Sequence, residues 1–234
     1  HSIRRRQRQM CIRDRMNTHM TVKHHLNEQL LMGYAAGILP EAFSLVIATQ
    51  VSISDEARAR LESYEAIGGG MLEDSDTEEM SPNALDSVFK KIEKSKSTVK
   101  TKAPEMVEGI FPEPLKKYTG DELNSIKWKN IGRGVKQSIL KTDKNASARL
   151  LYIPAGTAMP NHSHNGLEMT LVLEGSFYDK DGYFKRGDIE IGDQELHHKP
   201  TASDEGPCIC LIASDAPLKF KSILPRILQP FFKI

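Results

Sequence analysis

The stretch "PNHSHNGLEMTLVLEG", residues 160–175, decides the fold of the larger part of this chain. Two histidines and a glutamate stand just ahead of a short apolar run, which is typical of a β-strand. Side chains two positions apart on a strand lean to the same face, so His162 and His164 can approach a common point. Glu168 shares their parity if the strand resumes in phase after the Asn-Gly turn. The stretch therefore predicts a metal site on a β-sheet.

A further ligand has to come from a neighbouring strand, and "GDQELHHKP", residues 192–200, offers His197 and His198. Parity alone leaves both histidines open. Three neutral imidazoles and one carboxylate would leave a divalent ion with net positive charge and room for water. Such a set suits zinc first, with iron, manganese or nickel also compatible, and it does not suit calcium, which takes oxygen ligands.

Other short strands surround this stretch. Their residues follow a period of two, and turns rich in Gly, Pro, Asn and Asp separate them. Short strands at regular spacing are typical of a small sandwich or barrel. The strands that we expect lie in residues 136–141, 148–156, 168–179, 187–192 and 208–214.

Residues 25–95 have a different period, with apolar side chains three and four positions apart, which predicts helices. Pro40 suits the first turn of a helix, and Ser52 and Asp55 have the spacing of a capping box. The glycine-rich, acidic residues 68–81 predict a flexible segment that ends the third helix. The four expected helices span residues 26–39, 40–53, 52–67 and 83–94.

The change of period divides the chain into two domains. We expect an α + β protein with a small N-terminal helical bundle in residues 16–95, a basic polar linker in 96–105 and an all-β domain in 106–225. Residues 226–234 form a C-terminal tail. A bundle of this size has little core of its own. We therefore expect its apolar faces to complete their burial either against another protein or against the second domain. The pattern alone favours neither.

The first fifteen residues, "HSIRRRQRQMCIRDR", contain six arginines and one aspartate. They resemble a translated sequencing adapter, and we expect them to be non-native; the alternative is a basic arm that binds nucleic acid. Without them the basic residues fall from 32 to 26 and the acidic residues from 31 to 30, so the net charge changes from +1 to −4. This balance argues against a general DNA-binding surface, and we expect no direct nucleic-acid partner.

Only Cys208 and Cys210 remain after that exclusion, too few for a secreted disulfide framework. We interpret them as small buried apolar residues, with a redox role as the alternative. The longest apolar run, "AFSLVIA" in residues 42–48, is far shorter than the ~20 residues of a membrane helix. We therefore expect a soluble, cytoplasmic protein without a membrane partner.

The spacing of the ligands matches a known family. Gly156, five residues, His162-x-His164, three residues, Glu168 and six more residues to a glycine reproduce the first signature of the cupins. The second cupin signature places a histidine eleven positions after a glycine, and Gly187 plus eleven is His198. Its usual proline and glycine are replaced here by Asp193 and Glu195, which leaves the shape of that turn open. The resemblance implies a double-stranded β-barrel, with His198 rather than His197 as the ligand.

A second resemblance covers residues 20–220. The helical half, with "YAAG" and "EAFSLV.AT" as its most specific parts, is similar to the N-terminal domain of ChrR-type anti-sigma factors, and "HHKPTASDEGPCICLIASDAPLKF" is similar to the end of their cupin domain. The resemblance implies that residues 16–95 bind an extracytoplasmic-function sigma factor and hide it from RNA polymerase. It also implies that the cupin domain, with one divalent metal, mediates release under singlet-oxygen-type oxidative stress.

The helical half departs from that family at one point. Its zinc-binding members carry a His-x-x-x-Cys-x-x-Cys set and an upstream histidine. Here the corresponding positions are Gln50, Ser54 and Ala57, and His25 is the upstream histidine that remains. These side chains cannot form a structural thiolate site. We therefore expect a helical module that folds without zinc, although sigma binding without that zinc is left open.

Two alternatives to the regulator remain. One is a cupin enzyme, an iron-dependent dioxygenase that cleaves a small diketone-like substrate. The other is a metal barrel that serves stability and interaction alone. The enzyme is not favoured, because residues 156–212 offer no second acid or base at a telling spacing beside the ligands, and we expect no catalytic residues. Tyr178, Glu174 and Glu190 are the candidates, and the carboxylates are more simply interpreted as outward-facing strand residues.

Overall fold

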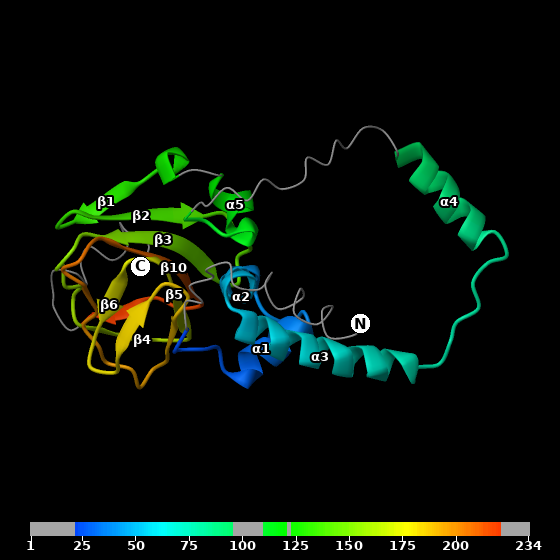
Figure 1. Ribbon diagram of the computed structural model, residues 1–234, viewed down its shortest axis with the longest axis horizontal. Coiled ribbons are helices and arrows are strands. Elements are labelled where there is room, and N and C mark those ends of the chain that lie inside the picture. The colour runs from blue at the N-terminus through cyan, green and yellow to red at the C-terminus, as the bar shows by residue number, and fades with distance from the viewer. Residues whose placement is uncertain (1–21, 96–109, 121–122, 221–234) are drawn as a thin grey trace, which may run out of the picture.

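The computed structural model describes residues 22–95, 110–120 and 123–220. Helices come first and strands follow (Figure 1), so the expected α + β organisation is confirmed. The expected non-native segment, the whole of the expected linker and the C-terminal tail lie outside the described residues. The helices are α1 (Glu28–Ala35), α2 (Glu41–Ile53), α3 (Asp55–Glu73), α4 (Ala84–Ser95) and α5 (Glu113–Thr119), and η1 (Leu123–Ser125) is a short 3-10 turn.

The helix boundaries correct two expectations. The N-cap of α3 is Ser54, whose hydroxyl accepts a hydrogen bond from the Ala57 amide at 3.2 Å, so the capping box expected at Ser52 is wrong. Ser52 instead donates to the carbonyl of Thr49. The helix also continues through residues 68–70 to Glu73, where we expected a loop. Each further residue of an existing helix adds one hydrogen bond, and this offsets the cost of glycine.

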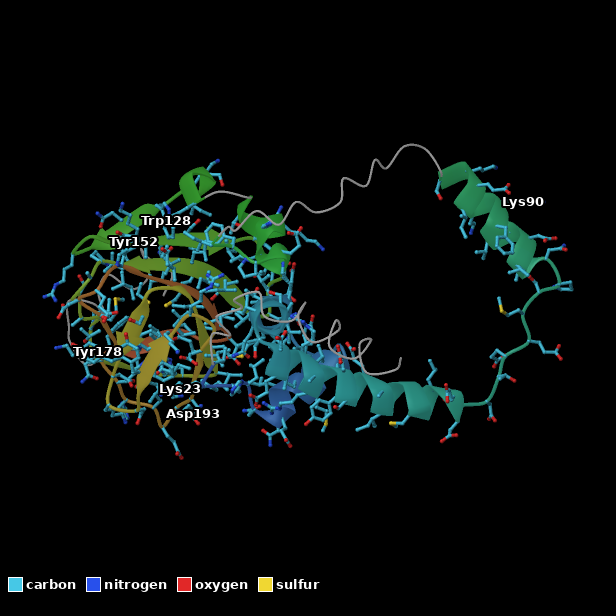
Figure 2. The ribbon with its side chains drawn as sticks, viewed as in Figure 1. Lys23, Lys90, Trp128, Tyr152, Tyr178 and Asp193 are labelled. Atoms are coloured by element: carbon cyan, nitrogen blue, oxygen red, sulfur yellow. The ribbon has the colours of Figure 1, made fainter. Side chains whose placement is uncertain are left out.

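Helix α4 is largely exposed to solvent. Its residues are exposed except for Ala84, which is partly buried. Figure 1 shows it away from the other helices, and in Figure 2 the side chains around Lys90 point into open space.

Within the described ranges, no helix is both long and apolar enough to span a bilayer.

The strands form one large and two small antiparallel sheets. The large sheet has the order β1-β2-β3-β10-β5-β8, and the small sheets have the orders β7-β6-β9 and β11-β4. The bounds are β1 (Lys129–Gly132), β2 (Val135–Leu140), β3 (Ser147–Ile153), β4 (His162–His164), β5 (Glu168–Glu174), β6 (Ser176–Tyr178), β7 (Tyr183–Lys185), β8 (Ile189–Gly192), β9 (Thr201–Ala202), β10 (Cys208–Ser214) and β11 (Leu218–Phe220).

The segment 168–179, expected as one strand, is two strands that belong to different sheets. The chain bends at Gly175, where φ is 69° and a Cβ atom would lie 2.2 Å from the carbonyl oxygen of Pro207. Glycine alone tolerates both this conformation and this approach. The bend carries the chain from the large sheet to a small one, which is how the barrel is closed around its interior.

The large sheet has two different buried faces. On β3, Ala148 and Leu150 face the helices, where they share one apolar cluster with α1, α2 and α5. Leu151 and Ile153 face inward and share a second cluster with Phe177 and other residues of the small sheets. Thus α1 and α2 complete their burial on the barrel, while α4 does not.

Candidate metal centre

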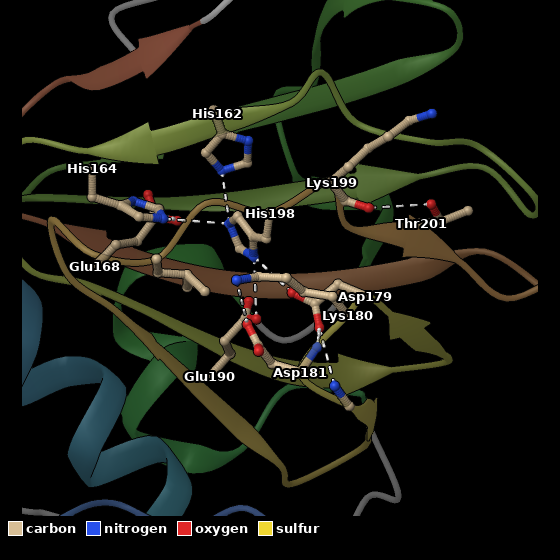
Figure 3. Close-up of polar contacts among 12 residues, drawn as sticks. His162, His164, Glu168, Asp179, Lys180, Asp181, Glu190, His198, Lys199 and Thr201 are labelled. Atoms are coloured by element: carbon tan, nitrogen blue, oxygen red, sulfur yellow. Dashed lines mark hydrogen bonds and ion pairs between the residues drawn. The ribbon is translucent and has the colours of Figure 1, made fainter.

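Three histidine side chains meet inside the barrel. His162 and His164 lie on β4, and His198 lies in the turn before β9, where its amide and carbonyl pair with those of His162. The Nε2 atom of His198 is 3.0 Å from Nε2 of His162 and 3.3 Å from Nε2 of His164 (Figure 3). All three side chains are buried. The structure thus brings together three of the four ligands that the sequence predicts.

The spacing of these nitrogens fits a bound ion. Two imidazole nitrogens that each lie about 2.0 Å from one tetrahedral zinc are themselves about 3.3 Å apart. Three imidazoles beside a carboxylate are the donor set of zinc, iron, manganese or nickel. The residues present therefore fit a divalent transition metal.

Hydrogen bonds to the far side of two rings orient them toward this centre. Nδ1 of His162 lies 2.8 Å from the carbonyl oxygen of Pro160, which fixes the proton on Nδ1 and leaves the lone pair on Nε2. Nδ1 of His198 lies 3.0 Å from Oδ2 of Asp179 and 3.2 Å from Oε1 of Glu190. Carboxylates in this position both orient a ligating histidine and increase its basicity.

Glu190 therefore corrects an expectation. We interpreted it as an outward-facing strand residue, but it is buried and faces the barrel interior, while Ile189 contributes to the outer cluster. Asp179 was not singled out at all, because it reaches His198 from the turn between β6 and β7. Neighbouring side chains on a strand face opposite sides of the sheet. The alternation in "GDIEIG" could therefore have predicted that Glu190 faces the interior, once Ile189 is assigned to the face that packs on the helices.

Glu168 lies at the edge of the cluster. Its Oε1 atom is 3.8 Å from Nδ1 of His164, and it is not among the side chains whose ligand atoms all lie within 4.8 Å of one another. His197, the histidine that the cupin spacing disfavours, is exposed. Close to His164, a Cβ atom at Gly192 would lie 2.8 Å from Nε2 of the ring, so a larger residue there would displace the ring.

Burial tunes the protonation of the cluster. It lowers the pKa of His162 to about 3 and that of His164 to about 4, so both rings are neutral and able to ligate at neutral pH. Burial acts the same way on His198, but the hydrogen bonds and charges of Glu190 and Asp179 outweigh it and raise its pKa. Burial also raises the pKa of Glu168 to about 7, although the positive charge of Arg149 opposes the shift.

The second predicted set, in the helical module, has other partners. Nε2 of His25 is 3.2 Å from the Glu56 carboxylate, Ser54 caps α3, and Ala57 is fully buried. Gln50 is also fully buried, and its side-chain amide donates to the carbonyls of Gly187 at 3.1 Å and His24 at 3.3 Å. In the part of the chain that the structure describes, the groups able to hold an ion both contain His198.

Cys208 and Cys210 lie on the inner face of β10. Both are free and buried, and their Sγ atoms are 3.5 Å apart. The hydrogen bond between Cys210 and Cys208, together with burial, raises the pKa of Cys210 well above its ordinary value. A raised pKa keeps the side chain as a thiol, which is the less reactive form. The packing interpretation agrees with this environment, and the redox role stays a prediction.

Comparison with known proteins identifies both halves of the chain. A family model described as the ChrR cupin-like domain matches residues 119–216. The anti-sigma-E factor ChrR of Cereibacter sphaeroides is 47% identical over 216 residues, which cover 92% of this chain and 100% of that protein. The crystal structure of Rhodobacter sphaeroides SigE in complex with the anti-sigma ChrR includes a chain with 45% identity and a TM-score of 0.74, covering 83% of this chain and 100% of that chain.

Likeness to enzymes of the same fold is remote. The crystal structure of an acetylacetone dioxygenase from Acinetobacter johnsonii is 14% identical, with a TM-score of 0.37, over 42% of this chain and 73% of that chain. A relation at this distance carries no argument about activity.

Proposed function

The chain belongs to the ChrR family of anti-sigma factors, and from this premise we propose that its helical part binds an extracytoplasmic-function sigma factor and withholds it from transcription. The protein is thus a negative regulator of transcription and not an enzyme. The similarity extends over both domains, and the dioxygenase alternative has no support from relatives of comparable identity. We place it in the cytoplasm, where a sigma factor acts.

The observation that carries this proposal is the apolar stripe of α4. Its large apolar side chains recur at spacings of three and four, so they lie on one face of the helix. They are between 47% and 64% exposed, and no described residue covers them. Soluble proteins rarely leave such a stripe open unless a partner covers it. The stripe consists of Leu85, Val88, Phe89 and Ile92.

The far end of α3 continues this pattern. Leu61, in the first half of the helix, is buried against the rest of the module, but Ile67, Met71 and Leu72 are exposed. Methionine and leucine on exposed helices are well suited to pack on an apolar partner surface. We propose that α4 and the end of α3 together form the surface that binds the sigma factor.

Phe89 tests this surface. An aspartate at this position would bury a charge in the interface, and loss of one central aromatic contact typically weakens binding by about 2 kcal/mol or more. We expect Phe89→Asp to lower the affinity for the co-expressed sigma factor at least about thirtyfold. The matched control is Ser87→Asp on the opposite side of α4, which should bind like the parent. Equal binding by both variants would contradict the proposal.

We also propose that the barrel holds one divalent metal through His162, His164 and His198, with Glu168 as a fourth ligand and zinc as the ion. When bound, such an ion supplies a Lewis acid that fixes the relative positions of its ligands. The chain's own residues prepare this site: burial keeps two rings neutral, and Asp179 and Glu190 hold the third ring in register.

The signal, we propose, is singlet-oxygen-type oxidative stress acting on the barrel. Release then requires only that the signal changes the relative free energies of the sigma-bound and released states. A suitable contact exists, because Asp188 at the start of β8 accepts hydrogen bonds from the amides of Lys23 and His24, just ahead of α1. The test is to expose the sigma complex to photogenerated singlet oxygen. We expect the sigma factor to be released from the full chain and to stay bound to a His198→Ala variant of it.

A further inference from the structure

The inner face of the barrel encloses a cavity of about 540 Å³ that His162 and His198 help to line. One end is polar, because His162, His198 and Glu168 line it together with Arg149. The remaining walls are mainly apolar and include Leu151, Ile153, Phe177 and Ile212. A cavity of this size, with apolar walls and a few converging polar groups, has the properties of a small-molecule site.

Arg149 is the unusual member of this lining. It lies on β3 with its side chain directed to the inner face, and it is 8% exposed. Its guanidinium donates to Oε1 of Gln137 at 3.4 Å and to Oγ of Ser147 at 3.2 Å, and both acceptors are neutral. Among the residues that the structure describes, no carboxylate oxygen comes within the 4.0 Å of an ion pair. A buried cation is costly unless an anion and further hydrogen bonds compensate it.

Glu168 does not remove this imbalance. It is the charged group that acts on Arg149 across the cavity, but its carboxylate lies beside His164, at 3.8 Å from Nδ1. As a ligand of a divalent ion, Glu168 would compensate the charge of that ion and not the charge of Arg149. Glu190 and Asp179, in turn, are hydrogen-bonded to His198. Arg149 is then the charged group at the polar end of the cavity that has no ion-pair partner among the described residues.

We propose that the cavity binds a small amphiphilic carboxylate, with its head group on Arg149 and its apolar tail along Leu151, Ile153, Phe177 and Ile212. The planar guanidinium presents paired N–H donors that match the two oxygens of a carboxylate. One buried cation balances one negative charge, so a monocarboxylate fits better than a phosphate ester. A wider hollow of about 1080 Å³ also has Arg149 in its lining, together with Leu218 and Phe220, so Arg149 borders both hollows.

This inference goes beyond the binding of a sigma factor and does not depend on it, but it rests on the proposed metal, with Glu168 as one of its ligands. It would make the barrel a receptor for a metabolite as well as a metal site. The two functions fail separately, because α4 contributes nothing to the cavity, and Arg149 contributes nothing to the α4 stripe.

Octanoate serves as the probe, and isothermal titration of the zinc-loaded full chain is the measurement. We expect saturable binding of one octanoate per chain. Octanol, which has the same tail without the charge, should bind at least about tenfold more weakly, because a charge-assisted hydrogen bond would be lost. This comparison needs no variant protein.

Arg149→Gln then tests the residue itself. We expect octanoate affinity to fall at least about tenfold while the zinc content stays the same, and the matched control Arg60→Gln, in α3, should bind like the parent. Equal affinity for octanol and octanoate would overturn the proposal, since apolar walls alone would explain it. Full octanoate binding by a zinc-loaded Arg149→Gln variant would also overturn it and would assign the carboxylate to the metal. Absence of saturable binding would show that the cavity has no such ligand.

Discussion

The two sets of residues that the sequence likens to metal sites, one in the barrel and one in the helical module, differ in how the structure arranges them. In the barrel, His162 and His164 come from one strand and His198 from a segment 34 to 36 residues further on, yet Nε2 of His198 lies 3.0 Å from that of His162 and 3.3 Å from that of His164. In the helical module the positions that family members use for zinc have acquired unrelated partners. Gln50 is the clearest case, because it now bonds the backbone of the other domain. The comparison teaches that positions without metal-ligating side chains can still be fully buried, as Gln50 and Ala57 are.

The replaced site also connects the two regions. Gln50 bonds the carbonyl of Gly187, the glycine that opens the second cupin signature. A Cβ atom at Gly187, where φ is 89°, would lie 2.8 Å from a methyl carbon of Val22 in the segment ahead of α1. Three residues further on, Glu190 bonds His198. The helical module therefore rests on the same short segment that orients a predicted metal ligand.

The largest effect should come from removing a barrel ligand. We predict that His162→Ala reduces bound zinc from about one equivalent per chain to almost none, because a tetrahedral site with one ligand missing binds far more weakly. Metal analysis of the purified protein measures this. The matched control is Gln50→Ala, which should keep the full equivalent. Two equivalents in the parent, one of them lost from the Gln50 variant, would show that the helical site still binds metal.

Proton release sharpens the role of Glu168. In the metal-free protein at about pH 6, Glu168, with a pKa of about 7, and His198, whose pKa is raised, carry protons, whereas His162 and His164 do not. Metal binds the deprotonated forms, so zinc uptake should release about two protons, and affinity should fall about a hundredfold per pH unit as the pH decreases from about 6. Titration calorimetry in buffers of different ionisation enthalpy counts the protons.

The variant Glu168→Gln tests whether Glu168 is a metal ligand. If Glu168 is a ligand, the variant should bind zinc more weakly and release about one proton. If affinity is unchanged, the carboxylate does not belong to the site, and the fourth position is open to water.

An intermediate effect is expected in the helical region. Gln50→Ala removes the donors to two carbonyls, and the buried carbonyl of Gly187 loses the side-chain amide that bonds it, which should cost about 1 to 3 kcal/mol of unfolding free energy. Denaturant unfolding measures the difference. The control Ser52→Ala, at an exposed position on the same helix, should change stability by less than about 0.5 kcal/mol. A Gln50 variant as stable as the Ser52 variant would mean that this contact does not join the domains energetically.

The smallest effect belongs to an exposed contact between the same regions. At the start of α2, Glu41 accepts a hydrogen bond from the hydroxyl of Tyr118, and this bond raises the pKa of Tyr118 to about 12. A raised pKa stabilises the fold while the phenol is neutral, and this contribution is lost as the pH rises through about 12. We predict that Glu41→Gln returns the pKa toward 10 and costs less than about 1 kcal/mol. Ultraviolet titration against Tyr118→Phe isolates the signal, and an unchanged pKa would contradict the assignment.

Much of the arrangement could be predicted because it depends on neighbours in the sequence. The period of two between residues 136 and 214 placed the principal strands, and the period of three to four placed α1, α2 and α4. The distance from Gly187 to His198 selected the histidine that the structure places in the cluster. The resemblance to ChrR-type anti-sigma factors is confirmed by identity over both domains.

The features that the sequence did not predict have other causes. Asp179 lies 19 residues from His198 and Gln50 lies 137 residues from Gly187, so no local pattern signals either contact. Helix α5 was missed because its seven residues are too few to display a period. The extension of α3 through three glycines was missed because local propensity argued against it and helix propagation prevailed.

By itself, the sequence determined the kinds of element, the residue types of the barrel ligands and the absence of thiolates from the helical module. These follow from side-chain chemistry and from periods that operate within a few residues. The tertiary structure alone decided that Glu190 faces inward, that Gln50 joins the two domains and that Arg149 lies buried beside an apolar cavity. Such facts depend on how distant segments pack, and packing is set by the burial of both sheet faces together rather than by any one stretch of chain.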